Sequence, residues 1–321
     1  MSLLEVKNLK TYFHIKAGVV KAVDGVSFTL DEGKAIGLVG ESGCGKTTTA
    51  LSIMKLLPPE GRIEGGEILF DGVNLVNESD EEIRKKRWKD ISLIFQGAMN
   101  AFNPVIRVGE QIIEAIRIHE DVSYDEARKR AGELFELVEI KKDLIDRYPH
   151  EFSGGMKQRA MIAMALACNP KLVIGDEPTT ALDVMIQAQI LDLLERLRKE
   201  MKMSMILITH DLSVMAETCD YVAVMYAGKI MEIGKVEKVL ENPLHPYTDK
   251  LIKAFPDIHG EKVMVESIPG VPPNLIDPPS GCRFHDRCHC AMEICKIKEP
   301  EIIQIEDDHK VACHLRGNCH E

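Results

Sequence analysis

The sequence predicts an α/β fold with a mainly parallel sheet. Short apolar runs, each followed at once by polar or glycine-rich residues, are typical of buried parallel strands. These runs are Ala35–Val39, Ile91–Phe95, Lys171–Gly175, Ser204–Ile208 and Tyr221–Tyr226. Helical patterns separate them, since Lys46–Leu57 runs to a stop at Pro58 and Val184–Glu200 carries aliphatic residues on one face. Ligands of such sheets bind beyond the carboxyl ends of the strands, so we expect the chemistry there.

Two predicted helices form an insertion in this fold. A capping box at Ser123 and Glu126 opens the first helix, and the second runs from about Gly155 to Cys168. The apolar face of the first comprises Ala127, Ala131, Leu134, Phe135 and Val138. From residue 241 onward prolines multiply, which indicates an appended, loop-rich segment. We expect an α/β domain over residues 1–255, with the insertion at about 99–170, and a C-terminal extension over 256–321.

Composition narrows the functional class. The chain has 321 residues, of which 45% are apolar, and this favours a packed core over disorder or a small disulfide scaffold. A formal net charge of −11 argues against nucleic-acid binding and against direct docking on anionic lipid. No apolar stretch approaches the ~18 residues of a spanning helix, and the N-terminus lacks a signal-peptide core. We expect a soluble, cytosolic protein.

Residues 40–47, with the sequence GESGCGKT, satisfy the phosphate-loop pattern G-x-x-x-x-G-K-[ST] between a strand and a helix. The glycines of this pattern let backbone N–H groups turn toward phosphate oxygens at the positive end of the helix. Lys46 would neutralise the β- and γ-phosphates, and Thr47 would offer its hydroxyl to Mg²⁺. Cys44 fits as a small residue and needs no redox role. Because motif and context agree, we prefer this interpretation to an ordinary glycine-rich turn.

Polar residues at the ends of other apolar runs are candidates for the second half of the site. Asp176 follows one run, where it would hold Mg²⁺, and Glu177 comes next, where it would polarise an attacking water. Gln96 follows another run and would sense Mg²⁺ or water, and His210 is a candidate contact to the γ-phosphate. A solvated acidic turn and a histidine without function are the alternatives.

A second glycine-rich element lies in the insertion. Ser153 precedes Gly154 and Gly155 and caps the helix that follows, whose first turn presents N–H groups to an anion. By itself this pattern fits a plain helix cap equally well. The element lies about 110 residues after the phosphate loop, which suggests that it serves a nucleotide held by another copy.

Together these ordered motifs resemble those of ATP-binding-cassette (ABC) ATPases over about residues 1–255. The matching elements are Walker A (Gly40–Thr48, containing Ser42, Gly43, Cys44 and Gly45), the Q-loop (Gln96), the signature motif (Ser153–Gln158), Walker B (Leu172–Glu177), the D-loop (Ala181–Asp183) and the switch histidine (His210). The signature motif has Met156 where many cassettes have Gln. The resemblance implies a P-loop, RecA-like fold and an aromatic residue that stacks on adenine, which would be Phe13 or Tyr12.

A finer resemblance is to the ATPase subunits of dipeptide and oligopeptide importers, carried by Val20–Phe28, Gly40–Gly43, Asn242–Thr248 and Pro279–Cys288. It implies that ATP with Mg²⁺ is held between this phosphate loop and the signature motif of a second ATPase subunit. Closure of that dimer would drive two membrane permease subunits, supplied by an extracytoplasmic solute-binding protein. The chain would bind peripherally at the cytoplasmic face of the membrane, and Gln96–Phe102 and the insertion would receive the permease.

Six of the nine cysteines lie in the last 40 residues. Among them Cys282, Cys288, Cys295 and Cys313 supply four thiolates, enough for one [4Fe–4S] cluster, and disulfides fit poorly with a reducing cytosol. Zinc is the alternative, although the spacing lacks the tight knuckles of structural zinc sites, and an unmetallated segment is another. The importer resemblance also implies such a cluster. Cys290 and Cys319 depart from the pattern of the relatives and could compete for a ligand position.

Two other functions stay open. A non-transport ABC protein of DNA repair or translation is disfavoured, because only 130 positions separate Lys46 from Asp176, without sustained heptads, and the motifs occur once. Transport of nickel or another small solute cannot be separated from peptide import, since selectivity resides in the binding protein and the permease.

Overall fold

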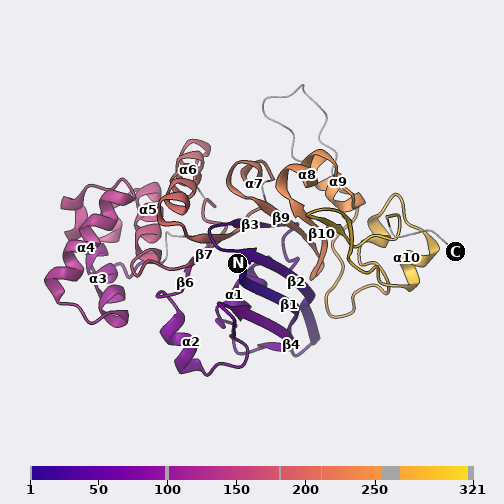
Figure 1. Cartoon of the computed structure of the whole chain (residues 1–321), viewed down its shortest axis with the longest axis horizontal. Coiled ribbons are helices and arrows are strands. Elements are labelled where there is room, and N and C mark those ends of the chain that lie inside the picture. Colours follow the sequence, from indigo (N-terminus) through magenta and orange to yellow (C-terminus); the bar gives the residue numbers. More distant parts are fainter. Residues whose placement is uncertain (1, 98–100, 181, 211, 255–267, 317–321) are drawn as a thin grey trace. The chain divides into compact units, whose positions relative to one another are not determined.

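The computed structural model describes residues 2–97, 101–180, 182–210, 212–254 and 268–316 (Figure 1). Its chain divides into two compact units, of which the first comprises Met1–Asp31, Ala35–Asn77 and Thr209–Glu321 and the second Glu32–Lys34 and Glu78–Ile208. No helix in the described ranges is long and apolar enough to cross a bilayer. The predicted start of the insertion, Ala181 of the predicted D-loop, Cys319 and the predicted domain boundary lie outside the described residues.

An antiparallel sheet in the first unit has the strand order β2-β1-β4-β5. Its strands are β1 (Ser2–Ile15), β2 (Gly18–Asp31), β4 (Gly61–Phe70) and β5 (Val73–Asn74). In β2 the side chains of Val26, Phe28 and Leu30 are buried and those between them are exposed, as expected for a sheet with one solvated face. The sequence analysis sought only continuous apolar runs, so it missed these strands.

A second group of strands belongs to the same unit. β3 (Ala35–Val39) pairs in parallel with β9 (Tyr221–Tyr226), and β9 pairs antiparallel with β10 (Lys229–Lys235). The C-terminal hairpin of β11 (Ile303–Glu306) and β12 (His309–Val311) joins the edge of β10. The helices of this unit are α1 (Lys46–Ile53), α7 (Leu212–Thr218), α8 (Val236–Glu241), α9 (Pro246–Lys253) and α10 (Glu293–Ile297). The C-terminal segment expected to be loop-rich therefore also extends a sheet.

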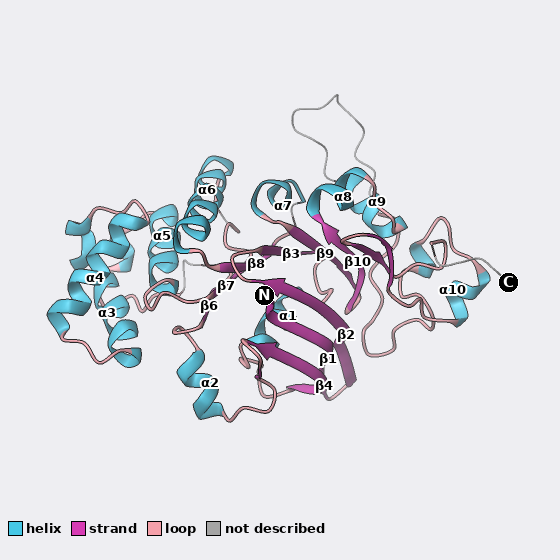
Figure 2. Cartoon of the chain, in the orientation of Figure 1, coloured by secondary structure: helices cyan, strands magenta, loops and turns pink. Residues whose placement is uncertain are grey.

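The second unit combines parallel strands with helices (Figure 2). β6 (Ile91–Ile94), β7 (Leu172–Asp176) and β8 (Ser204–Ile208) pair in parallel in that order and are buried. The helices are α2 (Asp80–Lys86), α3 (Val108–His119), α4 (Tyr124–Leu137), α5 (Gly154–Ala165) and α6 (Val184–Met201), with 3-10 turns at Lys142–Asp146 and Pro149–Glu151. The capping box of Ser123 and Glu126 at α4 is confirmed, and the predicted apolar face of α4 is buried.

Several element ends differ from the predictions. The helix expected over Lys46–Leu57 ends at Ile53, because Lys55 has a left-handed backbone conformation, with φ of 46°, that a helix cannot continue through. β7 is displaced by one residue, so Asp176 is the last strand residue rather than the first residue after the strand. β6 ends before Phe95, whose side chain is exposed.

A buried pair ties the C-terminal hairpin to β10. The side chains of Glu232 and His309 are 0% and 1% exposed, and Glu232 Oε1 lies 2.7 Å from His309 Nε2. The Glu232 carboxylate also accepts the backbone N–H groups of Leu244 and His245, each at 2.8 Å. Replacing Glu232 would therefore leave three buried polar groups without this partner.

We expect Glu232→Ala to lower the free energy of unfolding by about 3–5 kcal/mol, because unpaired buried polar groups lose hydration without compensation. Urea denaturation followed by circular dichroism measures the change. Lys235→Ala is the matched control, since Lys235 forms an exposed pair with Asp308 at 3.0 Å and such pairs contribute little. A loss no larger than that of the control would show that the buried pair does not stabilise the hairpin.

Candidate functional site

Left-handed glycines shape the phosphate loop between β3 and α1. Gly40, Gly43 and Gly45 have φ of 147°, 77° and 106°. A Cβ atom at Gly40 would lie 2.1 Å from the carbonyl oxygen of Met225, and one at Gly45 would lie 2.3 Å from that of Ala22. Since side chains at these two positions would clash with backbone atoms, this loop shape requires glycine there.

The first turn of α1 has the form of an anion site. Gly45 precedes the helix, and no side chain caps it. In an uncapped first turn, the N–H groups and the positive end of the helix dipole both favour a phosphate group. Ser42 and Thr47 are exposed and Thr48 is half-buried beside this turn. The local structure is therefore the one that the phosphate-loop motif predicts.

The ammonium group of Lys46 is held inside the loop. The residue is 6% exposed, and Nζ donates to the carbonyl oxygens of Gly40 at 2.7 Å and Glu41 at 3.0 Å. Cys44 is buried beside it, and burial raises the pKa of the Cys44 thiol. A thiol with a raised pKa is protonated at neutral pH and is a poor nucleophile, and that Cys44 needs no redox role stays a prediction.

An acidic strand end lies in the second unit. Asp176 is 6% exposed at the end of β7, and Glu177 follows with a left-handed φ of 46°. Gln96 Nε2 donates to Glu177 Oε2 at 2.8 Å, and Thr180 Oγ1 donates to the same oxygen at 2.9 Å. The structure thus brings together two of the predicted residues, Gln96 and Glu177. It adds Thr180, which the sequence analysis missed. The one signal in the sequence was its position three residues after Glu177.

The backbone at Glu177 is strained. A non-glycine residue in the left-handed region costs about 1–2 kcal/mol, and such strain is concentrated at functional sites. The Glu177 N–H donates to the carbonyl oxygen of Ile208 at 2.9 Å, which holds this backbone in place. Strain and hydrogen bonding therefore both mark Glu177 as a residue whose orientation matters.

The predicted signature serine caps α5. Ser153 Oγ accepts the N–H of Met156 at 3.3 Å, and the helix ends at Ala165, before the expected Cys168. A Cβ atom on Gly155 would lie 2.9 Å from the side chain of Ile186, so this glycine permits close packing of α5 and α6. Asp183 caps α6 in the same way, and its contact to a nucleotide stays a prediction.

Three further candidates belong to the first unit. His210 is exposed just after β8. Tyr12 and Phe13 are half-buried neighbours on β1, and successive side chains of a strand point to opposite faces. The Tyr12 hydroxyl donates to Asp24 at 2.7 Å, and burial together with this hydrogen bond raises the pKa of Tyr12 to about 12. Stacking of either ring on adenine stays a prediction.

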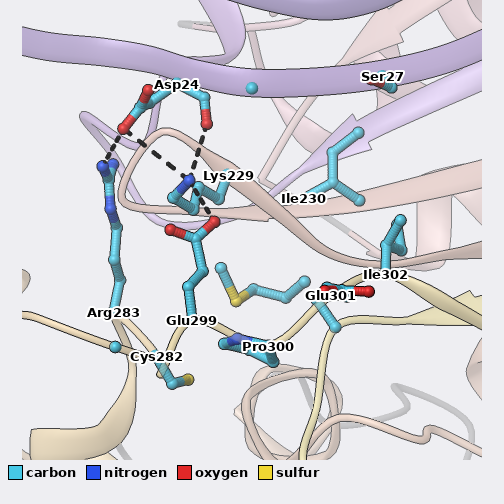
Figure 3. Close-up of a pocket in the computed structure, with 14 residues that line it drawn as sticks. Asp24, Ser27, Lys229, Ile230, Cys282, Arg283, Glu299, Pro300, Glu301 and Ile302 are labelled. Carbon is cyan, nitrogen blue, oxygen red and sulfur yellow. Dashed lines mark hydrogen bonds and ion pairs between the residues drawn. The ribbon is translucent and has the colours of Figure 1, made fainter. Parts of the chain in front are cut away.

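A charge network joins the C-terminal segment to β2 and β10 (Figure 3). The Arg283 guanidinium donates to the Asp24 carboxylate and to the carbonyl oxygen of Ala227. Lys229 Nζ lies 2.6 Å from Glu299 Oε1 and donates to the backbone oxygen of Asp24 at 3.0 Å. The side chains of the network, those of Asp24, Lys229, Arg283 and Glu299, line a cavity of about 480 Å³. The sequence analysis missed this network because its members are far apart along the chain.

Comparisons with known proteins bear on both ends of the chain. Residues 23–180 match the family described as ABC transporter, and residues 231–295 match the oligopeptide/dipeptide transporter C-terminal region. The oligopeptide transport ATP-binding protein OppD of Bacillus subtilis (strain 168) is 50% identical over 318 residues, 98% of this chain and 88% of that protein. The dipeptide transport ATP-binding protein DppD of the same strain is 46% identical, over 98% of this chain and 95% of that protein. This chain belongs to the oligopeptide/dipeptide transporter family of ABC ATPases.

A solved structure supports the same fold for this ABC ATPase. The ATP-binding cassette MJ0796, in a dimeric post-hydrolysis state bound to ADP and Pi, is 28% identical with a TM-score of 0.66, covering 73% of this chain and 98% of that one. The predicted P-loop α/β fold of an ABC nucleotide-binding domain is thereby confirmed. Family membership makes the protein an ATPase, for which ATP and Mg²⁺ are the expected ligands.

The C-terminal segment of this ABC ATPase brings the predicted cysteines near one another. The Cys282 N–H donates to the carbonyl oxygen of Cys295 at 2.8 Å. Burial raises the pKa of the Cys282 thiol, and the thiols of Cys295, Cys313 and Cys288 raise it further. All four are free thiols. Nevertheless, within the described ranges no group of three or more His, Cys, Asp or Glu side chains has an arrangement that could hold a metal ion. Four thiols are the ligands that a [4Fe–4S] cluster requires, but in this structure they are not arranged to hold one.

Proposed function

We propose that this chain is the ATP-hydrolysing subunit that energises uptake of dipeptides and oligopeptides through a membrane permease. Relatives named for oligopeptide and dipeptide transport are 50% and 46% identical over 98% of the chain, which supports the peptide cargo. The observation that carries the ATPase activity is the phosphate loop, with its left-handed glycines, the buried Lys46 and an uncapped helix behind it.

The phosphate loop, residues 40–48, would bind the ATP phosphates through its backbone N–H groups. Lys46 would exchange the loop carbonyl oxygens that it now contacts for oxygens of the β- and γ-phosphates. Thr47, Asp176 and Gln96 are the residues that would hold Mg²⁺, because hydroxyl, carboxylate and amide oxygens suit this ion. When bound, Mg²⁺ supplies positive charge that screens the phosphates.

Glu177 would orient the water that attacks the γ-phosphate in line. Its carboxylate is suited to this role because Gln96 and Thr180 both donate to Oε2 and so restrict its rotation. His210 would contact the γ-phosphate and, with Lys46, offset the charge that develops in the transition state. Each of these roles acts on charge or orientation, which are the main terms in phosphoryl transfer.

A second ATPase subunit, either a copy of this chain or a paralogue, would complete the nucleotide site. Its Ser153, Gly154 and Gly155 would contact the γ-phosphate from the far side, Asp183 would lie at the dimer contact, and the Phe13 or Tyr12 ring would stack on adenine. Closure of this dimer would move two permease subunits at the cytoplasmic face of the membrane. A solute-binding protein on the opposite side would deliver the peptide.

Reconstitution tests this function. The full chain, purified with two permease subunits and placed in liposomes with the matching solute-binding protein, should import labelled di- and oligopeptides only when ATP is present. Import of Ni²⁺ without import of peptide would contradict the proposed peptide substrate but not the proposed ATPase role. Co-purification with ribosomes or DNA in place of membrane permeases would contradict the transport function.

We also propose that Cys282, Cys288, Cys295 and Cys313 bind a [4Fe–4S] cluster, with zinc as the alternative. Four free thiols near one another support this, although binding would require them to move into a tighter arrangement. Anaerobically purified protein should contain about four iron and four sulfide ions per chain, and Cys288→Ser should lose them. Cys219→Ser, a buried cysteine outside the segment, is the control. Colourless protein with zinc and no sulfide, or with neither metal, would overturn the cluster.

A further inference from the structure

The phosphate loop is held by the C-terminal segment through one of its own residues, Glu41. Arg287, 246 positions later, donates from Nη1 to Glu41 Oε2 at 2.6 Å and from Nη2 to Glu41 Oε1 at 3.0 Å. Two parallel N–H···O bonds between a guanidinium and a carboxylate form the strongest common type of side-chain ion pair. The sequence analysis did not predict the pairing of Glu41 with Arg287.

Every N–H group of the Arg287 guanidinium donates a hydrogen bond in this position. A guanidinium has five N–H donors, and the remaining three bonds go to the carbonyl oxygens of Pro269 at 2.7 Å and Ile268 at 3.3 Å and to the hydroxyl of Tyr226 at 3.2 Å. The side chains of Arg287 and Glu41 are 5% and 25% exposed, so water screens their attraction weakly. The hydrogen bonds to Glu41 raise the pKa of Arg287, which therefore stays charged.

A second, independent contact reaches the same loop residue. The Tyr247 hydroxyl on α9 accepts the Glu41 N–H at 3.0 Å. Tyr247 is fully buried, and its ring packs against those of Tyr226 and Phe284, with centroid distances of 4.8 Å and 5.2 Å. Phe284 belongs to the C-terminal segment, so the same aromatic cluster fixes both the segment and the hydroxyl.

All polar groups of Glu41 are therefore hydrogen-bonded within the protein. Its carboxylate is bound by Arg287, its N–H by Tyr247, and its carbonyl oxygen by the ammonium of Lys46. Because N–H groups of this loop must point at phosphate oxygens, a change in the orientation of the Glu41 peptide changes the phosphate cradle itself. A loop that must reorganise before it binds also binds more weakly, by the cost of the reorganisation.

We propose that Arg287 and Tyr247 are positioning residues of the phosphate loop, through which the C-terminal segment sets the affinity of this ATPase for nucleotide. The proposal rests on the proposed function in one respect, namely that this loop binds the phosphates. It assigns to the segment a role in nucleotide binding that does not depend on whether the cysteines hold a metal.

The test is the dissociation constant of ADP, measured by isothermal titration calorimetry on the full purified chain. Arg287→Ala should raise it about tenfold, because a buried bidentate pair is lost, and Tyr247→Phe should raise it about threefold, because only one neutral hydrogen bond is lost. Lys296→Ala, which removes an exposed ion pair with Glu293 in the same segment, is the control and should leave the constant unchanged. In steady-state assays KM for ATP should follow these changes while kcat stays within about twofold.

A double-mutant cycle separates positioning from general damage. In a Glu41→Ala background Arg287→Ala should have almost no further effect, since the residue acts through Glu41. An equal effect of Arg287→Ala in both backgrounds would overturn the proposal, as would unchanged affinity in both Arg287→Ala and Tyr247→Phe. If Arg287→Ala does not fold, Tyr247→Phe decides alone, because it removes a single oxygen atom. Unchanged affinity in Lys46→Ala would instead contradict the phosphate-binding function of the loop.

Discussion

Glu177→Gln is expected to bind ATP with unchanged affinity and to hydrolyse it at least about 100-fold more slowly, the usual contribution of a positioned general base. The substitution keeps the size of the side chain and its oxygen, which can still accept from Gln96 and Thr180. What it removes is the negative charge that polarises water. ATP turnover by phosphate release, together with the dissociation constant of ATP, measures both halves of the expectation.

The control for this substitution is Asp192→Asn, which neutralises an exposed carboxylate on α6 of the same unit. It should hydrolyse ATP at the unmodified rate. Because Glu177→Gln binds ATP without consuming it, ATP should also hold it in the dimeric state, which sedimentation velocity detects. Turnover at the unmodified rate by Glu177→Gln would remove this residue from its catalytic role.

Lys46→Ala should lose ATP binding, with a dissociation constant raised about 100-fold, since charge-assisted hydrogen bonds to phosphate contribute about 3 kcal/mol. Lys46 is the single basic residue among residues 40–48, so no other cation of the loop can replace it. Its ammonium group already lies against the loop carbonyl oxygens of Gly40 and Glu41. Calorimetry with ATP in the absence of turnover measures the loss.

Lys85→Ala provides the comparison for Lys46→Ala, because it removes a lysine that pairs with Glu82 on the exposed surface of α2. Its affinity for ATP should equal that of the unmodified chain. Unchanged affinity for ATP in Lys46→Ala would contradict the assignment of phosphate binding to this loop.

Local pattern was enough to predict the parallel strands and the caps. β3, β8 and β9 have the expected bounds, since continuous apolar runs have few alternatives to a buried strand. The caps at Ser123 and Ser153 are confirmed, because a cap is a contact over three residues. The predicted end of α1 was wrong. The helix stops before Lys55, whose left-handed backbone conformation cannot be predicted from its residue type.

Contacts between distant residues could not be predicted in this way. Gln96 and Glu177 were each selected for following a strand, but their hydrogen bond depends on β6 and β7 being neighbours. The four cysteines were predicted to share one site, and the structure brings them close without forming a metal-ligand group in the described residues. The sequence shows which ligand and hydrogen-bonding groups are present, whereas the tertiary structure sets the distances between them.

The amino-acid sequence by itself determined the phosphate loop, the order of the ATPase motifs and the strands that carry them, because each of these depends on residues within one turn or one strand of each other. Only the tertiary structure decided that Arg287 and Tyr247 hold the loop at Glu41. Those contacts join residues 246 and 206 positions apart, and they require the aromatic cluster and the C-terminal segment to be packed within the first unit.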